Sequence, residues 1–330
     1  MKFNKFSQNL LKLTFLAIIL VFVGYFGGCS NTTTNNNQTD EQYLQGVVTS
    51  GSQFSTDEDN LMSAEGSDLN DGGAYDDNGN PGPMSPLDTL LRWGRIVDHV
   101  NVNFAGSFSG DTVYSGLVTR TITGHFRIIG IKNGLPDSVD KSYTEVLTRF
   151  IAFKRVDRTL YPRLNWRLYQ LSCLSGGTTA PQNGNSNTQI VGIAVYVNGF
   201  LKDTLVGPNF NNEVFTTLRF GGTGIPKVVQ GDNVTIYVTV NSSEINNYVA
   251  WHWARNAYGF HRVPFTYVSS MPGPNGYYVT FSKTVTIRNG HPLGVFSGYL
   301  NASTHESLYD DDPSKFSSTE VGIPYRVIQQ

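Results

Sequence analysis

The chain has 330 residues, of which 39% are hydrophobic and 15% charged, with a formal net charge of -2 and two cysteines. This composition excludes collagen, a coiled coil and a multi-pass membrane protein, and the length suits about two domains. Tyr and Phe are abundant, at 17 and 20 residues, while the charged fraction lies below the ~25% of an average soluble domain. We therefore predict a mainly β protein, because aromatic residues favour strands.

An export signal is predicted over residues 1–28. Lysines precede an apolar run from Leu13 to Phe26, and no acidic residue occurs before Asp40, which is typical of the charged and apolar regions of a signal peptide. The run is shorter than the ~20 apolar residues that a spanning helix needs. We therefore expect it to be cleaved from the mature protein.

The end of this segment, Phe26-Gly27-Gly28-Cys29, resembles the lipobox of bacterial lipoproteins. The resemblance implies a diacylglyceryl group on the sulfur of Cys29, cleavage after Gly28 and acylation of the new N-terminus. Two or more acyl chains hold a protein durably on a bilayer. Ser30 follows the cysteine where inner-membrane lipoproteins carry Asp, so the resemblance implies the outer membrane, facing the periplasm or the exterior. The alternative is an ordinary secretory signal with an incidental cysteine.

Residues 29–84 are predicted to form a disordered, acidic and polar tether. No Lys or Arg lies between Ser30 and Pro83, and apolar residues are few, so the segment buries too little surface to offset its chain entropy. With Cys29 acylated, Cys173 has no disulfide partner. The basic excess of the remaining chain lies in Arg92–Arg167. The acidic tether could fold back on this basic module or keep the protein soluble, and we favour the second because charge runs are usually solvated.

Residues 85–174 are predicted to form an α+β module. Ser85-Pro86-Leu87-Asp88 is typical of a helix start, so we expect a short helix to about Val97. Period-two alternation then predicts strands: Val100–Phe104, Val118–Ile131, Thr148–Val156 and Trp166–Ser172. A short helix on a curved antiparallel sheet, ending in Trp166-Arg167-Leu168, loosely resembles an NTF2-like or cystatin-like half-fold. That resemblance brings no catalytic motif.

Residues 175–188 are rich in Gly, Thr and Asn and predict a linker, and residues 189–330 predict a β-sandwich module. Turn signals at Asn198-Gly199 and Gly231-Asp232 separate short apolar runs. The expected strands are Ile190–Val197, Val214–Phe220, Val234–Val240, Tyr248–Trp253, Pro264–Ser269, Tyr277–Ile287 and Val295–Leu300. The pattern resembles the immunoglobulin-like class without its cysteine pair.

Two kinds of metal site are candidates. A hairpin turning near Asn256-Ala257 would place His252 opposite His261, close enough to share a metal, with His291 or Asp310 as a third ligand. Acidic clusters suggest calcium: Asp68–Gly73, Asp76–Asn80, and Asp310, Asp311 and Asp312. Neither of the first two fits the EF-hand spacing. The alternatives are a packed hairpin and solvated acidic loops.

A third candidate site is aromatic. Trp251 and Trp253 share a strand face, which would stack on sugar rings if it were exposed and fill the sandwich core if it were buried. We favour burial. The chain has no nucleophile elbow, HExxH or phosphate-binding loop, and Cys173 is expected to be a buried apolar residue.

The sequence therefore predicts a lipid-anchored cell-envelope protein of a non-catalytic binding or structural type. Its partners would be the bilayer, through acylated Cys29, and an envelope protein or glycan. A glycan-binding or glycan-processing accessory protein, with calcium as a candidate stabilising ion, is the alternative. Nucleic acid is not expected as a partner, because the basic excess is small and the compartment is wrong.

Overall fold

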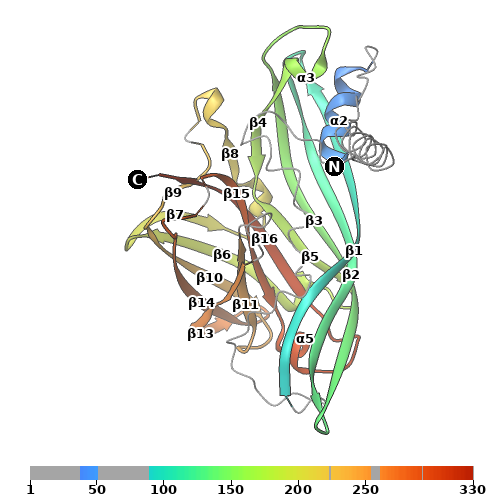
Figure 1. Ribbon diagram of the computed structural model, residues 1–330, viewed down its shortest axis with the longest axis vertical. Helices are drawn as coiled ribbons and strands as arrows, with labels where there is room; N and C mark the ends of the chain where they lie inside the picture. Colours follow the sequence, from blue (N-terminus) through green and yellow to red (C-terminus); the bar gives the residue numbers. More distant parts are fainter. Residues whose placement is uncertain (1–37, 51–88, 223, 254–260, 292, 330) are drawn as a thin grey trace, which may run out of the picture. The chain divides into compact units, whose positions relative to one another are not determined.

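Strands dominate the computed structural model, which describes residues 38–50, 89–222, 224–253, 261–291 and 293–329. Asp40–Gln330 forms one compact unit, and within it the described strands make two antiparallel sheets (Figure 1). The expectation of a mainly β chain with a sandwich is confirmed. A short helix near the N-terminus accompanies the sheets, although it is formed by a different segment from the one expected.

The larger sheet, which we call the curled sheet, has eleven strands among the described residues, in the order β1-β2-β3-β5-β16-β15-β11-β12. β4 pairs with β3 and β8, and β9 lies parallel to β16. The strands are β1 (Thr89–Ser109), β2 (Val113–Lys132), β3 (Leu135–Arg155), β4 (Trp166–Ser172), β5 (Leu174–Ala180), β8 (Val214–Thr216), β9 (Lys227–Val229), β11 (Tyr248–Trp253), β12 (His261–Pro264), β15 (Gly294–Ser303) and β16 (Ser318–Ile328).

The smaller sheet, which we call the capping sheet, has the order β13-β14-β10-β6-β7. Its strands are β6 (Thr188–Val197), β7 (Phe200–Val206), β10 (Asn233–Ser242), β13 (Thr266–Gly273) and β14 (Gly276–Thr286). The predicted turn between β6 and β7 is present. Asn198 and Gly199 both have positive φ, 51° and 85°, as a two-residue hairpin turn that matches the twist of its strands requires.

Short helices connect or cover the strands. They are α2 (Asp40–Ser50), α3 (Pro162–Asn165), α4 (Gly184–Asn187) and α5 (His305–Tyr309), with 3-10 turns at Phe210–Asn212 and Leu218–Phe220. α2 has acidic residues in its first turn, where they favour the helix dipole. Its Leu44, Val47 and Val48 lie at helical spacing and are buried against the β1–β4 region.

Three clusters of buried side chains make up the core. One lies between the two sheets and includes Val238 and Val240 of β10 and Leu300 of β15. A second lies on the face of β1–β4 that α2 covers. A third fills the hollow of the curled sheet, where Phe316 stacks on Phe126 with centroids 4.7 Å apart.

The curled sheet bends until its two outermost strands touch through side chains. The guanidinium of Arg262 on β12 lies 3.5 Å from the centre of the Trp93 ring on β1, and it donates a hydrogen bond to the Trp93 carbonyl at 3.2 Å. Tyr248 of β11 meets the same ring edge-on, with centroids 4.8 Å apart. The sheet therefore encloses its third core cluster between its own ends.

The expectation of a helix from Ser85 to about Val97 is wrong. Ser85–Asp88 lie outside the described residues, and Thr89–Val97 belong to β1, which pairs with β2 from Thr89 to Ser109. Ladder hydrogen bonds to β2 and burial of alternate residues, Trp93 and Arg95, outweigh a local cap signal, because a helix start is worth only about 1 kcal/mol.

Two other expected segments differ in the structure. Asp40–Ser50, placed in the disordered tether, is the packed helix α2; the tether residues 51–84 and the export segment lie outside the described residues. The expected linker 175–188 contributes β5, which pairs with both β3 and β16, and α4. The two expected modules therefore share one sheet.

We predict that α2 is part of the folded unit. Leu44→Ala is expected to lower the free energy of unfolding by about 2–5 kcal/mol, because it removes a fully buried side chain. Urea denaturation of the full chain measures this. Thr49→Ala, an exposed position on the same helix, is the control and should change stability by no more than ~0.5 kcal/mol. Equal, small effects of both substitutions would show that α2 is not docked.

Candidate functional site

An open cavity of about 340 Å³ lies between the two sheets, within the usual range of ~300–1,000 Å³ for small-molecule sites. One wall is the capping sheet, with Val195, Ile236 and Val285 from three adjacent strands. The opposite wall comes from the curled sheet, chiefly Trp251 and Ile323. Both walls are apolar, so the cavity suits a ligand with a hydrocarbon or aromatic body.

Charged residues surround this apolar interior. Lys202 on β7, Lys227 on β9 and Arg288 after β14 line the cavity and are exposed. Asp203 is the acidic residue in the lining, and His291 lies beside Phe296, with ring centroids 5.1 Å apart. The charge at the rim is therefore predominantly positive, which favours an anionic group on the ligand.

Of the predicted aromatic pair, the structure describes the side chain of Trp251, which lies in the interior. Trp251 is 8% exposed, faces Tyr325 with centroids 6.2 Å apart, and forms part of the cavity wall. Gly298 on β15 makes room for it, since a Cβ there would overlap the indole. The side chain of Trp253 lies outside the described residues. Trp251 thus offers its ring to the cavity and not to an open strip on the surface.

The predicted histidine pair is not aligned across the hairpin. His252 pairs with Arg262, whereas His261 pairs with Trp253, so the register is shifted by one residue from the one that would place the histidines opposite each other. His252 is buried, and the side chain of His261 lies outside the described residues. The described part of the chain contains no group of three or more His, Cys, Asp or Glu that could hold a metal.

The predicted acidic cluster at Asp310, Asp311 and Asp312 faces a buried lysine. The Nζ of Lys141 donates hydrogen bonds to the carbonyls of Glu306 and Lys315, both at 2.9 Å. Burial lowers the pKa of Lys141 to about 8, and the carboxylates of the cluster oppose this shift. Calcium binding by this cluster stays a prediction, and the clusters at 68–73 and 76–80 lie outside the described residues.

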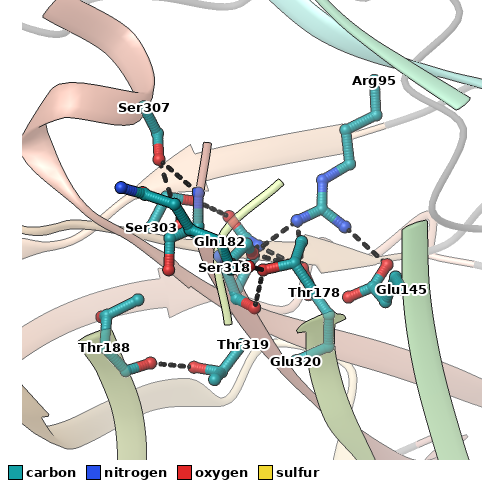
Figure 2. A network of polar contacts seen from close by, with 12 residues as sticks. Arg95, Glu145, Thr178, Gln182, Thr188, Ser303, Ser307, Ser318, Thr319 and Glu320 are labelled. Atoms are coloured by element: carbon teal, nitrogen blue, oxygen red, sulfur yellow. Dashed lines mark hydrogen bonds and ion pairs between the residues drawn. The ribbon is translucent and has the colours of Figure 1, made fainter. Parts of the chain in front are cut away.

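A buried polar network joins β1, β3 and β16 (Figure 2). Arg95 forms ion pairs with Glu145, at 3.2 Å, and with Glu320. Arg95 also donates to the hydroxyl of Ser318 at 2.6 Å, and that hydroxyl donates to Glu320 at 2.9 Å. Asn301 completes the group by donating to both Ser318 and Glu320.

This network has two carboxylates for one arginine. Burial raises the pKa of Glu320 to about 7, with Arg95 opposing the shift and Glu145 adding to it. Burial also raises the pKa of Glu145, again opposed by Arg95. Because neither glutamate has any exposed surface, the pair cannot contact a solute in this conformation. We therefore assign the network to the architecture of the curled sheet and not to a reaction.

Cys173 is fully buried between β4 and β5, as expected. Burial raises the pKa of its thiol to about 12, so the thiolate that reacts or binds metal is disfavoured. Cys29, the predicted lipidation site, lies outside the described residues.

The cavity itself was not predicted from the sequence. Its walls come from seven strands that belong to both sheets, and alternating Val and Ile residues look the same whether they fill a core or line a pocket. A partial signal was available in Lys227 and Arg288, which are next to the apolar lining residues Val228 and Ile287.

No protein-family model, curated protein or solved structure matches this chain. Of the helices that the structure describes, none has the length and apolarity needed to cross a bilayer. The cavity and its charged rim are therefore interpreted from their own chemistry.

We predict that Glu320 makes stability fall as pH rises. Its pKa is higher in the folded state than in the unfolded chain, so the folded state binds more protons between the two values, and stability is lost as pH rises through about 7. Chemical denaturation at pH 5 to 8 should show a smaller decline for Glu320→Gln than for the unmodified chain. Asp137→Asn, at an exposed position near the start of β3, is the control. A decline unchanged by Glu320→Gln would contradict this assignment.

Proposed function

We propose that the protein is a lipid-anchored cell-envelope protein that binds, without catalysis, an amphiphile with an apolar body and an anionic group. The observation that carries the proposal is the cavity between the sheets, with apolar walls and the basic residues Lys202, Lys227 and Arg288 at its rim. Burial of apolar ligand surface contributes about 25 cal/mol per Å². The rim adds charge complementarity, which selects an anion over a cation.

The composition of the lining supports binding and not catalysis. The described lining residues include one carboxylate, Asp203, two hydroxyls, on Thr286 and Tyr325, and no serine or cysteine. A nucleophile held by a general base, or two facing carboxylates, would be expected for hydrolysis. The cavity lining contains neither arrangement among the residues that the structure describes.

The proposed lipid anchor is supported by the sequence that precedes the folded unit. Phe26-Gly27-Gly28-Cys29 at the end of an apolar run supports acylation at Cys29. An anchored protein would keep its binding cavity near a bilayer, where amphiphiles with acidic headgroups are concentrated. The ligand class and the anchor therefore support one another.

We predict that dodecanoate binds in the cavity more tightly than dodecyltrimethylammonium, which has the same chain and the opposite charge. Val197→Trp fills the apolar wall and is expected to abolish binding of dodecanoate, measured by isothermal titration calorimetry. Tyr196→Trp is the matched control, because Tyr196 is the adjacent β6 residue and its ring packs on Tyr237, away from the lining.

A charge variant tests the rim. Lys227→Glu together with Arg288→Glu should weaken dodecanoate binding by about twofold to thirtyfold, from ~0.2–1 kcal/mol for each exposed ion pair. Lys132→Glu together with Arg219→Glu, two positions outside the cavity lining, gives the same change in net charge and is the control. Equal affinities for the two detergents, or binding that survives Val197→Trp, would overturn the proposed ligand class.

We predict that the mature N-terminus is an acylated Cys29. Mass spectrometry of protein from the envelope fraction should find a peptide that begins at Cys29 and carries the mass of a diacylglyceryl group and an added acyl chain. Cys29→Ser should move the protein to the soluble fraction. Recovery of the native chain with residues 1–28 attached and no lipid would refute the anchor.

A further inference from the structure

We propose that the loop between β3 and β4, residues 156–165, is a bilayer-contact element that inserts its apolar side chains into an anionic membrane surface. The inference deepens the proposed function, on which it rests for the identity of the membrane. It assigns a membrane-contacting role to a specific part of the fold beyond the acylated cysteine.

The loop displays apolar side chains to solvent. Leu160 is 88% exposed, Tyr161 and Leu164 are each 42% exposed, and Val156 is 44% exposed. Singly exposed apolar residues are ordinary on protein surfaces, but four within nine consecutive residues form a patch. Such patches indicate a site of contact with a protein or a membrane.

Hydrogen bonds within the loop fix its backbone, so its apolar side chains are held in exposed positions. Asn165 is buried; its side chain accepts a hydrogen bond from the backbone N–H of Thr159 at 2.7 Å and donates one to the Thr159 carbonyl at 2.9 Å. The carbonyl of Asn165 also accepts from the N–H of Val156 at 2.6 Å. These bonds close the loop at its base and hold Leu160 and Tyr161 outwards.

Basic residues flank the apolar patch. Lys154, Arg155, Arg158, Arg163 and Arg167 lie in or beside the loop, and Asp157 is the acidic residue of this stretch. Two arginines are already paired, Arg155 with Asp40 and Arg158 with Asp111. The remaining positive charge favours an anionic lipid surface over a neutral one, and long basic side chains can keep their charge at the headgroups while the loop inserts.

The chain leading to the proposed anchor leaves the fold beside this loop. Asp40, the first residue of α2, pairs with Arg155 at the base of the loop, and α2 contacts α3 within the loop. Figure 1 shows both helices beside the same end of the long strands. Eleven residue steps separate Cys29 from Asp40, and they span at most about 40 Å when extended. An acyl group on Cys29 would therefore hold this end of the fold near the bilayer.

The opposite end of β3 provides a matched control. Leu135 is 69% exposed and begins the strand that ends at Arg155, which corresponds to about 66 Å of chain along the strand at ~3.3 Å per residue. The two leucines are similar in chemistry and exposure. They differ in their distance from α2 and in the basic residues around them.

Fluorescence of a polarity-sensitive label tests the proposal on the full, unacylated chain. Leu160→Cys or Leu135→Cys, each with Cys29→Ser, is labelled with a nitrobenzoxadiazole maleimide; Cys173 is buried and should not react. Vesicles with phosphatidylglycerol should shift the emission of the label at 160 to the blue, and pure phosphatidylcholine should shift it less.

A second experiment measures partitioning of unlabelled Cys29→Ser chains onto the anionic vesicles. Leu160→Ser with Leu164→Ser should lower this partitioning on the order of tenfold, and Leu135→Ser should not.

The outcomes separate this inference from the proposed anchor. The apolar segment before Cys29 is common to both labelled chains, so a difference between positions 160 and 135 reports on the loop alone. Equal emission at the two positions, or no preference for the anionic lipid, would overturn the bilayer-contact role even if Cys29 is acylated. If the label at position 160 reports insertion but Cys29 proves unmodified in cells, the bilayer-contact role of the loop is supported and the proposed lipid anchor is overturned.

Discussion

The buried ion pairs of Arg95 require the large sheet to be curved. The partners of Arg95 are Glu145 on β3 and Glu320 on β16, and β1 and β16 are four strand spacings apart in the sheet order. A flat sheet would separate them by about 19 Å, farther than an arginine and a glutamate can reach together. The ion pair is therefore compatible only with a curled sheet, and the same curl brings Arg262 onto Trp93.

The polar network and the cavity share the strand β16. β16 holds Glu320 on one side of the network and contributes Ile323 and Tyr325 to the cavity wall a few residues later. The cavity-wall residues Val195 and Val285 are only half-buried, whereas Val238 and Val240 of the same sheet are fully buried. Twisted sheets that pack face to face cannot stay in contact over their whole area. The cavity is the part of the interface where they separate.

The packed helix α2 changes the interpretation of the N-terminal region. A tether that extended to residue 84 would leave the fold free to move far from a membrane. Because α2 begins eleven residues after Cys29 and its Asp40 pairs with Arg155, an acylated Cys29 would be within a short chain length of the end of the fold that carries Leu160. Lipid attachment and loop insertion would then restrict its orientation as well as its location.

The sequence by itself determined the strands with a clear period of two, the turns at Asn198-Gly199 and Gly231-Asp232, and the burial of Cys173, because each depends on neighbouring residues. It also contains the helical spacing of Leu44, Val47 and Val48, although the polar residues around them are typical of a tether. Only the tertiary structure decided that Thr89–Val97 is a strand, that β5 and β16 join the two expected modules, that His252 faces Arg262, and that Trp251 lines a cavity. Those outcomes depend on pairing between residues far apart in the chain, whose energies exceed the local preferences that a sequence pattern reports.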